Sequence, residues 1–537
     1  MNRCRHTVLS LFSGILLSLP WLELFPGWIL IVAFLPLLAV EDELLQPGHK
    51  TSACAFSGQA WLCFFAWNGL SCWWIGKVSV TGAILVIMLN AVCMSFVWML
   101  AHQIRRKRGN RLGRLFLLTG WLAFEYLHSR LEPEWPWMNL GNGLAGQVQL
   151  IQWYEYTGVP GGTFWILCLN LLFFRLYKSL TDLRHESKLT LMLFIPALLL
   201  IPSLWSANTY RRYRDQGKKI QLILLQPDID PYREKFGGLS DSAQIQILLQ
   251  LTDSLLNDST ELVIGPETVL PPLSLTSSPG AHPYLVPFYR RAQNRKHLQF
   301  ILGAITRTGG EDQKRMKHAD TSLANQRDTA YNSALLIDGS DRLQASHKTI
   351  LVSGVEKMPY SGLFGFLEKY LISLGGTAES LGTPENLSCL SGRNKLPVAA
   401  VICYESAFGE HVSRLVSQGA RLLVVITNDG WWTGTPAPRQ HLAFSRLRAI
   451  ETRRSVARSA NTGISALINQ RGDLLALSSQ DCRTALTGSL QANIHTTFYV
   501  SHGDYLGRIA VFLSAILLLL LPGRKLPSGL KNKKNPH

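Results

Sequence analysis

The sequence is poor in charge, and most of all in negative charge. Asp, Glu, Lys and Arg make up only 17% of the 537 residues, with 36 acidic against 53 basic side chains. Such a low charged fraction is unusual for a soluble globular protein, and a mean hydropathy of +0.11 agrees with it. The chain is also too long for one ordinary core. These values favour a membrane protein built from more than one part.

The sequence also lacks motifs that would link its net charge of +17 to nucleic-acid binding or its nine cysteines to zinc binding. No nucleic-acid recognition motif accompanies the basic residues, which gather beside apolar segments, so we expect no nucleic-acid partner. No Cys-x-x-Cys or Cys/His spacing indicates zinc. Most cysteines lie in apolar stretches and are expected to be small buried hydrophobes. Cys389 and Cys482 could pair in an oxidising compartment, which the sequence leaves open.

Long apolar runs fill the first 206 residues and return near the end of the chain. They predict spans near residues 7–22, 24–40, 53–75, 78–101, 115–129, 159–176, 189–205 and 506–522. Several approach the ~20 residues that cross a bilayer. Arg3 and Arg5 precede the first run, as in a signal peptide, but no small-residue cleavage site is obvious. Because more spans follow, we expect a retained helix.

Basic residues predict the orientation of these spans. With eight spans, the basic loops at residues 102–114 and 175–188 and the tail after residue 522 share one side with the N-terminus, which is then cytoplasmic. The stretch at residues 210–505 must face outward. Basic residues at 211–219 disagree, but long domains cross a membrane largely regardless of charge.

Residues 220–495 have a different character. Apolar runs of strand length occur at residues 220–226, 262–266, 300–305, 334–337, 398–403, 422–427 and 464–469. Helical patterns lie between them, and one covers residues 441–454. Alternating strands and helices predict an α/β domain whose sheets are covered by helices. Polar stretches at residues 309–326 and 363–393 are expected to be loops.

Three polar residues follow apolar runs of this domain: Glu267, Lys348 and Cys403. Each has an ordinary explanation by itself, because a cysteine at a strand end is usually structural, a glutamate can cap a helix and a lysine is usually solvated. Together, a carboxylate, an ammonium and a thiol at strand ends are the parts of acyl transfer through a thioester.

The order of these residues resembles the Glu-Lys-Cys triad of the nitrilase superfamily. The matching segments are Gly265-Pro266-Glu267, the Lys348 segment, Cys403-Tyr404-Glu405 and Thr427-Asn428-Asp429-Gly430-Trp431-Trp432. The helix expected after them and the segment at residues 458–465 also match. The resemblance implies that Cys403 is the nucleophile, that Glu267 takes its proton and that Lys348 stabilises an oxyanion.

A nitrilase-type domain between seven upstream spans and one downstream span resembles the apolipoprotein N-acyltransferase family. Residues 125–130, 135–137, 158–161 and 497–504 match the membrane part of that family. The expected fold is therefore a polytopic α-helical membrane protein of about eight spans with an inserted nitrilase-like αββα sandwich. We expect a membrane domain at residues 1–209, a catalytic domain at 210–500, and a last span with a basic tail at 501–537.

The resemblance implies a function and a location. A phospholipid would donate an acyl chain to Cys403, and the N-terminal amine of an S-diacylglyceryl-cysteine lipoprotein would accept it. The enzyme would be a monomer in the bacterial inner membrane, with its catalytic domain in the periplasm, and would need no metal or organic cofactor. A membrane-tethered amidase that hydrolyses a small C–N bond is the alternative, and a non-catalytic lipoprotein-binding protein is a third interpretation.

The resemblance also assigns further site residues. Glu356, Tyr404 and Glu405 are expected to support the triad, and Phe236, Trp431 and Trp432 to bind substrate, although the tryptophans fit core packing equally well. The sequence departs from the family where Pro-Phe-Gly is replaced by residues 353–355, and where Phe236 stands in place of a tryptophan. Glu125, inside a predicted span, is expected to be functional or to pair with Arg130.

Overall fold

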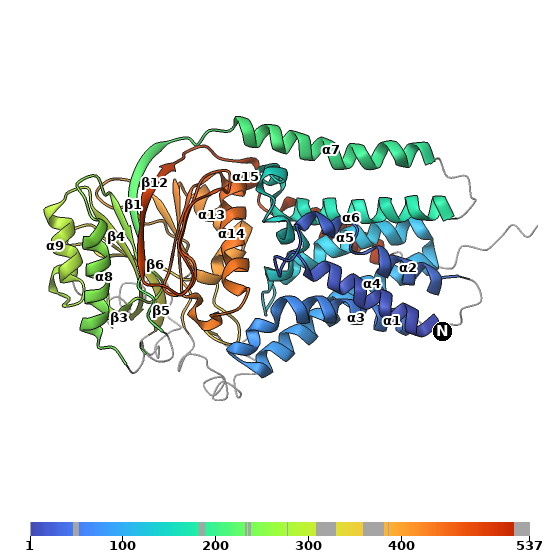
Figure 1. Ribbon diagram of the computed structural model, residues 1–537, viewed down its shortest axis with the longest axis horizontal. Coiled ribbons are helices and arrows are strands. Elements are labelled where there is room, and N and C mark those ends of the chain that lie inside the picture. The colour runs from blue at the N-terminus through green and yellow to red at the C-terminus, as the bar shows by residue number, and fades with distance from the viewer. Residues whose placement is uncertain are drawn as a thin grey trace, which may run out of the picture.

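The computed structural model describes residues 2–46, 53–181, 188–230, 234, 238–275, 278–307, 329–357, 381–384 and 386–519. A bundle of helices occupies one end of the molecule and two β-sheets occupy the other (Figure 1). The bundle contains α1 (Asn2–Ser18), α2 (Leu35–Leu44), α3 (Ala53–Cys72), α4 (Val80–Arg108), α5 (Asn110–His128), α6 (Tyr154–Thr181), α7 (Lys188–Arg212) and α16 (Tyr505–Leu519). Segments from both ends of the chain therefore build the helical part.

Three of the described helices are long and apolar enough to cross a membrane, namely α4, α6 and the part of α7 from Thr190 to Arg212. On α7, Leu193, Phe194, Ile201 and Leu204 each expose more than 60% of their surface, which favours contact with lipid rather than water. The span expected at residues 24–40 is instead broken into a 3-10 turn (Gly27–Ile31) and the ten-residue α2, too short to cross a bilayer. The count of eight spans stays a prediction.

The α/β part contains two sheets. The larger has the order β12-β1-β2-β4-β5-β6, with β3 also paired to β4, and the smaller has the order β11-β10-β9-β8-β7. The strands are β1 (Lys218–Gln226), β2 (Leu262–Ile264), β3 (Leu270–Ser274), β4 (Gln299–Arg307), β5 (Ala330–Ile337), β6 (Gln344–His347), β7 (Val398–Ile402), β8 (Leu422–Thr427), β9 (Val456–Ala460), β10 (Ala466–Ile468), β11 (Leu474–Leu477) and β12 (Thr484–Ala492).

Each sheet is covered on both faces. Leu222 and Leu224 of β1 pack with Val424 and Ile426 of β8 in the core between the sheets. The outer face of the larger sheet is covered by α8 (Asp241–Leu255) and α9 (Val286–Asn294), and that of the smaller sheet by α13 (Gly409–Ser417) and α14 (Ala437–Thr452). The result is a four-layer αββα sandwich, as the sequence predicts.

The helix layer of α13 and α14 faces the bundle, whereas α8 and α9 lie at the far end of the molecule (Figure 1). All seven strands expected from the sequence are present, within a few residues of their predicted bounds. Phe236, the polar stretch at residues 309–326 and the tail after residue 519 lie outside the described residues.

Candidate functional site

Cys403 lies at a sharp change of backbone direction. β7 ends at Ile402, and a 3-10 turn (Cys403–Ala407) begins at the cysteine itself. The φ angle of Cys403 is 53°, a left-handed conformation that is uncommon for residues other than glycine and is typical of functional sites. The thiol residue is buried, with 6% of its surface exposed.

Lys348 lies between two carboxylates. Its Nζ is 3.2 Å from Oε1 of Glu267 and 2.9 Å from Oε1 of Glu356. Lys348 exposes only 1% of its surface, and both glutamates are also buried. The structure thus brings together one supporting residue and two of the three residues of the predicted triad.

Glu267 is positioned by a close approach between strands. It follows β2, and the next residue, Thr268, has a φ angle of 48°. A Cβ on Gly303 of β4 would lie 2.5 Å from the Pro266 carbonyl oxygen and 2.7 Å from Cα of Glu267. Glycine at position 303 therefore lets the turn that carries the glutamate pack directly on the sheet.

Asn332 is a site residue that the sequence analysis missed. Its Nδ2 donates to Oε1 of Glu267 at 2.7 Å and to Oε1 of Glu356 at 3.2 Å. The backbone carbonyl oxygen of Asn332 accepts a hydrogen bond from the backbone N–H of Lys348 at 2.7 Å. A polar residue inside the apolar run of β5 was the available signal, because a buried amide needs hydrogen-bond partners.

The charges of this group act on the thiol. Burial raises the pKa of Cys403, the negative charge of Glu267 raises it further, and the Lys348 ammonium opposes both. Burial disfavours the Lys348 ammonium, but the charges of Glu267, Glu356 and Cys403 outweigh burial and hold the pKa of the lysine well above its usual value. The resting thiol is therefore neutral beside a charged ammonium, and needs a base before it can act as a nucleophile.

Glu405 connects the Cys403 turn to the Lys348 segment. Its Oε2 accepts from the backbone N–H of Ile402 at 2.8 Å, and its Oε1 accepts from the N–H and the hydroxyl of Thr349 at 2.7 and 2.8 Å. Burial would raise the pKa of Glu405, but the charge of His411 and these N–H donors outweigh it and lower the pKa to about 2. The ionised Glu405 carboxylate therefore connects the Cys403 turn to the Lys348 segment.

Tyr404 faces the helical bundle. Its ring stacks on Trp137 with centroids 6.3 Å apart, and its hydroxyl donates to the carbonyl oxygen of Glu134 at 2.7 Å. Trp432 belongs to the same cluster, with centroid distances of 5.0 Å to Trp74 and 6.3 Å to Trp137. Aromatic residues of the bundle thus reach the residue next to the thiol. Trp431 is half-buried.

A buried network supports the turn from behind. Nε2 of His441 lies 3.0 Å from the carbonyl oxygen of Cys403, and its Nδ1 lies 2.9 Å from Oδ1 of Asp429. Arg458 donates to the second Asp429 oxygen at 2.7 Å. Burial would raise the pKa of Asp429, but the Arg458 charge and His441 outweigh it and lower the pKa. His441 is therefore a hydrogen-bonding residue that supports the turn.

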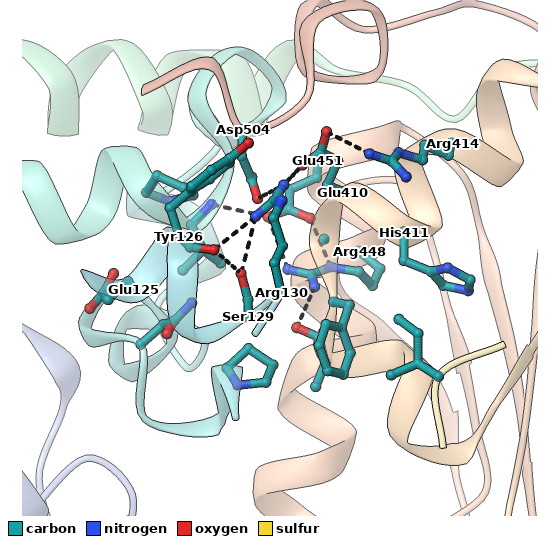
Figure 2. Close-up of a pocket in the computed structure, with 18 of the residues that line it drawn as sticks. Glu125, Tyr126, Ser129, Arg130, Glu410, His411, Arg414, Arg448, Glu451 and Asp504 are labelled. Carbon is teal, nitrogen blue, oxygen red and sulfur yellow. Dashed lines mark hydrogen bonds and ion pairs between the residues drawn. The ribbon is translucent and has the colours of Figure 1, made fainter. Parts of the chain in front are cut away.

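A cavity of about 300 Å³ lies where the bundle meets α13 and α14 (Figure 2). Of the two alternatives expected for Glu125, a functional role or a pair with Arg130, the pair is wrong. Arg130 instead forms ion pairs with Glu410 and Asp504. Glu125 accepts from Trp121, Thr163 and the backbone N–H of Leu140, because the chain bends back over it after α5. Arg130 therefore links the bundle to the catalytic part.

The remaining polar groups give no sign of a metal centre. Among the described residues, no cluster of three or more His, Cys, Asp or Glu side chains is placed to hold a metal ion. Cys389 and Cys482 are both free thiols. The chemistry available here is that of a thiol, an ammonium and two carboxylates.

Family models match both parts of the chain. The model described as the apolipoprotein N-acyltransferase N-terminal domain matches residues 13–172, and the carbon-nitrogen hydrolase model matches residues 236–497. The matched regions coincide with most of the helical bundle and with the αββα sandwich.

Two relatives matched along nearly the whole chain carry the same name. The apolipoprotein N-acyltransferase of Chlorobaculum tepidum is 27% identical to this chain, and the match covers 96% of each. That of Geobacter metallireducens is 26% identical and covers 97% of this chain and 96% of its own. A crystal structure of a branch 10 member of the nitrilase superfamily from Saccharomyces cerevisiae matches 52% of this chain and 93% of its own at 14% identity, with a TM-score of 0.36.

Proposed function

The chain belongs to the apolipoprotein N-acyltransferase family, and on this premise we propose that it transfers an acyl chain from a phospholipid to the N-terminal amine of S-diacylglyceryl-cysteine lipoproteins. The observation that carries the proposal is the position of Cys403. The charges of Lys348 and Glu267 act on its buried thiol, and its neighbour Tyr404 packs on tryptophans of the bundle. The proposed nucleophile thus lies next to the helical bundle, which is the part of the protein proposed to lie in the membrane.

In the first half-reaction, Glu267 takes the proton of the Cys403 thiol as the sulfur attacks the ester carbonyl carbon of the phospholipid. The carbonyl oxygen becomes an oxyanion, which the Lys348 ammonium stabilises; such a donor contributes about 3 kcal/mol. The carbon–oxygen bond then breaks, and Glu267 returns its proton to the departing lysophospholipid. The enzyme is left as an acyl thioester.

In the second half-reaction, the lipoprotein amine attacks the thioester carbonyl carbon. The carbon–sulfur bond breaks, Glu267 accepts a proton from the attacking amine, and Cys403 regains a proton as the amide forms. Burial of Cys403 favours this outcome over hydrolysis, because water is kept from the thioester.

We propose the domain organisation and orientation that the sequence predicts. Residues 1–209 form the membrane domain, residues 210–500 the catalytic domain, and residues 501–537 the last span and basic tail. The catalytic domain faces the periplasm of a bacterial inner membrane. The support is the distribution of basic residues and the exposed apolar surface of α7.

Glu356 holds Lys348, Glu405 braces the turn, and Tyr404 and Trp432 form the wall toward the bundle. Phe236 and Trp431 are proposed to contact substrate, on the family resemblance alone. A membrane-tethered amidase has less support, because the relatives matched along nearly the whole chain are named as N-acyltransferases.

The test is to look for the acyl-enzyme. Purified protein in detergent is mixed with a phospholipid carrying an isotope-labelled acyl chain, and the peptide containing Cys403 is examined by mass spectrometry. The proposal predicts a labelled acyl adduct on Cys403 that hydroxylamine removes. The Cys403→Ala variant is the control. No adduct on the wild-type peptide would contradict the proposed reaction.

A further inference from the structure

A large cavity, distinct from the one in Figure 2, lies where α14 and β11 meet the outer loops of the bundle. Its volume is about 650 Å³, and its walls include Trp21, Gly143, Arg446 and Leu477. None of the predicted triad residues lines it. The cavity sits at the junction between the catalytic domain and the helices that hold lipid, so its chemistry bears on how a membrane ligand is held.

One face of α14 brings two arginines to this cavity. Arg439, Ala443 and Arg446 line it and, at spacings of four and three residues, share one side of the helix. Arg439 pairs with Glu23 at 3.2 Å, and both side chains are exposed. Arg446 is half-buried and donates from Nε to the carbonyl oxygen of Gly472 at 2.9 Å. Along the described chain, no carboxylate lies within ion-pair distance of Arg446.

Arg446 is therefore a cation that lacks a close counter-ion. Burial lowers its pKa, while the more distant charges of Asp473, Tyr210 and Glu23 act in the opposite direction. A partly desolvated guanidinium with unused donors is costly unless an anion completes it. Its planar group of donors is suited to the oxygens of a phosphate.

The rim of the cavity is apolar. Leu474 and Leu477 line it, and with Leu475 they expose 37%, 49% and 53% of their surfaces on β11, the edge strand of the smaller sheet. β11 is fixed to the bundle, because the hydroxyl of Tyr210 on α7 donates to Asp473 at 2.6 Å. Exposed leucines beside a membrane helix are expected to touch lipid.

The wall formed by the segment after α1 carries Glu23 and also aromatic side chains. Trp21 lines the cavity, and the loop that follows exposes Phe25 and Trp28, whose rings meet at 5.0 Å. Aromatic side chains of this kind concentrate where a membrane meets water. The two arginines thus lie between apolar side chains of β11 and of the segment that follows α1.

We propose that this cavity binds the head group of the phospholipid acyl donor, with Arg446 and Arg439 holding its phosphodiester and the leucines of β11 contacting its apolar part. The inference rests on the proposed function. Phe444 lines the cavity and meets Trp137 at 4.8 Å, and Trp137 stacks on Tyr404 beside Cys403. A donor held here is one aromatic layer from the turn that carries the nucleophile.

The experiment measures binding without turnover. The full-length Cys403→Ala protein in detergent is titrated with a short-chain diether phosphatidylglycerol, the matching dialkylglycerol without phosphate, and inorganic phosphate. Arg446→Gln should weaken binding of the diether phospholipid about tenfold, as expected for loss of a charge-assisted contact. Arg446→Lys should restore part of it, and Arg439→Gln should weaken it about threefold.

Arg291→Gln on α9, far from the bundle, is the control and should bind as the parent does (Figure 1). The dialkylglycerol should bind at least tenfold more weakly than the phospholipid, and inorganic phosphate more weakly still. Thermal melting checks that each variant is folded; if Arg446→Gln is not, the exposed Arg439→Gln decides.

Equal affinity of the folded arginine variants and their parent for the diether phospholipid would overturn the proposal. The proposal would also be overturned if the parent bound the dialkylglycerol as tightly as the diether phospholipid, because the phosphate would then not be recognised. It would likewise be overturned if inorganic phosphate bound as tightly as the phospholipid, because a free anion would then suffice. These results are independent of the acyl-enzyme test. If binding depends on the arginines but no thioester forms, the proposed function is wrong and the head-group site remains. If a thioester forms but binding does not depend on the arginines, the head-group site is wrong and the proposed function remains.

Discussion

The backbone N–H of Thr349 donates a 2.7 Å hydrogen bond to Oε1 of Glu405. The residue after Lys348 is thereby fastened to a side chain two residues after Cys403. Glu405 also accepts from Ile402, at the end of β7. One carboxylate thus sets the distance between the segment that carries the ammonium and the turn that carries the thiol.

Replacing Glu405 by Gln should destabilise the protein in a pH-dependent way. The pKa of Glu405 is lowered to about 2, so its carboxylate contributes stability fully above the ordinary pKa near 4.5, on the order of 3 kcal/mol. That contribution is lost as the pH falls through about 2. Melting in detergent should show Glu405→Gln well below wild type at pH 7, with the difference shrinking between pH 4.5 and pH 2.

Glu261→Gln is the matched control, because Glu261 pairs with the exposed Lys218 at the protein surface and should cost little. A difference between wild type and Glu405→Gln that is the same at pH 7 and pH 2 would contradict the role of the ionised carboxylate.

Asn332→Ala should lower kcat about tenfold and change the donor KM little, since the amide acts through Glu267 and Glu356, which it holds in place. Steady-state kinetics in mixed micelles measures both constants. Ser333→Ala is the control on the same strand, because Ser333 bonds Thr306 and His347 instead. A higher donor KM with an unchanged kcat would instead assign Asn332 to binding the substrate rather than to positioning Glu267 and Glu356.

Glu267→Gln and Lys348→Met should both prevent formation of the acyl-enzyme. A glutamine amide at position 267 cannot take the thiol proton, and general-base catalysis contributes about 10²–10⁴ in rate. A methionine thioether at position 348 cannot stabilise the oxyanion, and that stabilisation contributes about 10²–10³ in rate. The rate of Cys403 acylation by labelled phospholipid is followed by mass spectrometry. Acylation of either variant at the wild-type rate would exclude the role assigned to that residue.

The proposed orientation predicts which side of the membrane is labelled in intact cells. A cysteine at the fully exposed Asp258 in the catalytic part should react with a membrane-impermeant maleimide. One at Arg106, exposed in the last turn of α4, should react only after permeabilisation. Parents that lack the exposed Cys4 give the background. The reverse pattern would overturn the orientation and the access to periplasmic lipoproteins.

Much of the sandwich could be predicted from the sequence, because buried strands such as residues 398–402 and 422–427 are continuous apolar runs. β12 was missed because it is largely polar and only half-buried along its length. The break at residues 24–40 was missed because the expectation followed the apolar run and not its prolines: Pro26 precedes the 3-10 turn, and Pro36 lies in the first turn of α2, where a helix begins.

The candidate site likewise contains some residues that the sequence reveals and others that only the fold reveals. Cys403, Lys348 and Glu267 could be found because each follows an apolar run in a familiar order. Asn332 was not found because its partners, Glu267 and Glu356, are distant in sequence and meet only in the fold. The partner of Arg130 was predicted wrongly for the same reason: Glu410 and Asp504 lie hundreds of residues away.

The most direct test of a covalent acyl-enzyme is the release of lysophospholipid when no acceptor is present. Enzyme at micromolar concentration is mixed with phospholipid, and lysophospholipid is counted per enzyme over time. The account predicts a burst of about one lysophospholipid per enzyme, absent in Cys403→Ala, followed by renewed release when an S-diacylglyceryl-cysteine peptide is added. If no lysophospholipid appears until the peptide is added, transfer does not pass through Cys403 as a thioester, and the mechanism built on Glu267, Lys348 and Cys403 is wrong.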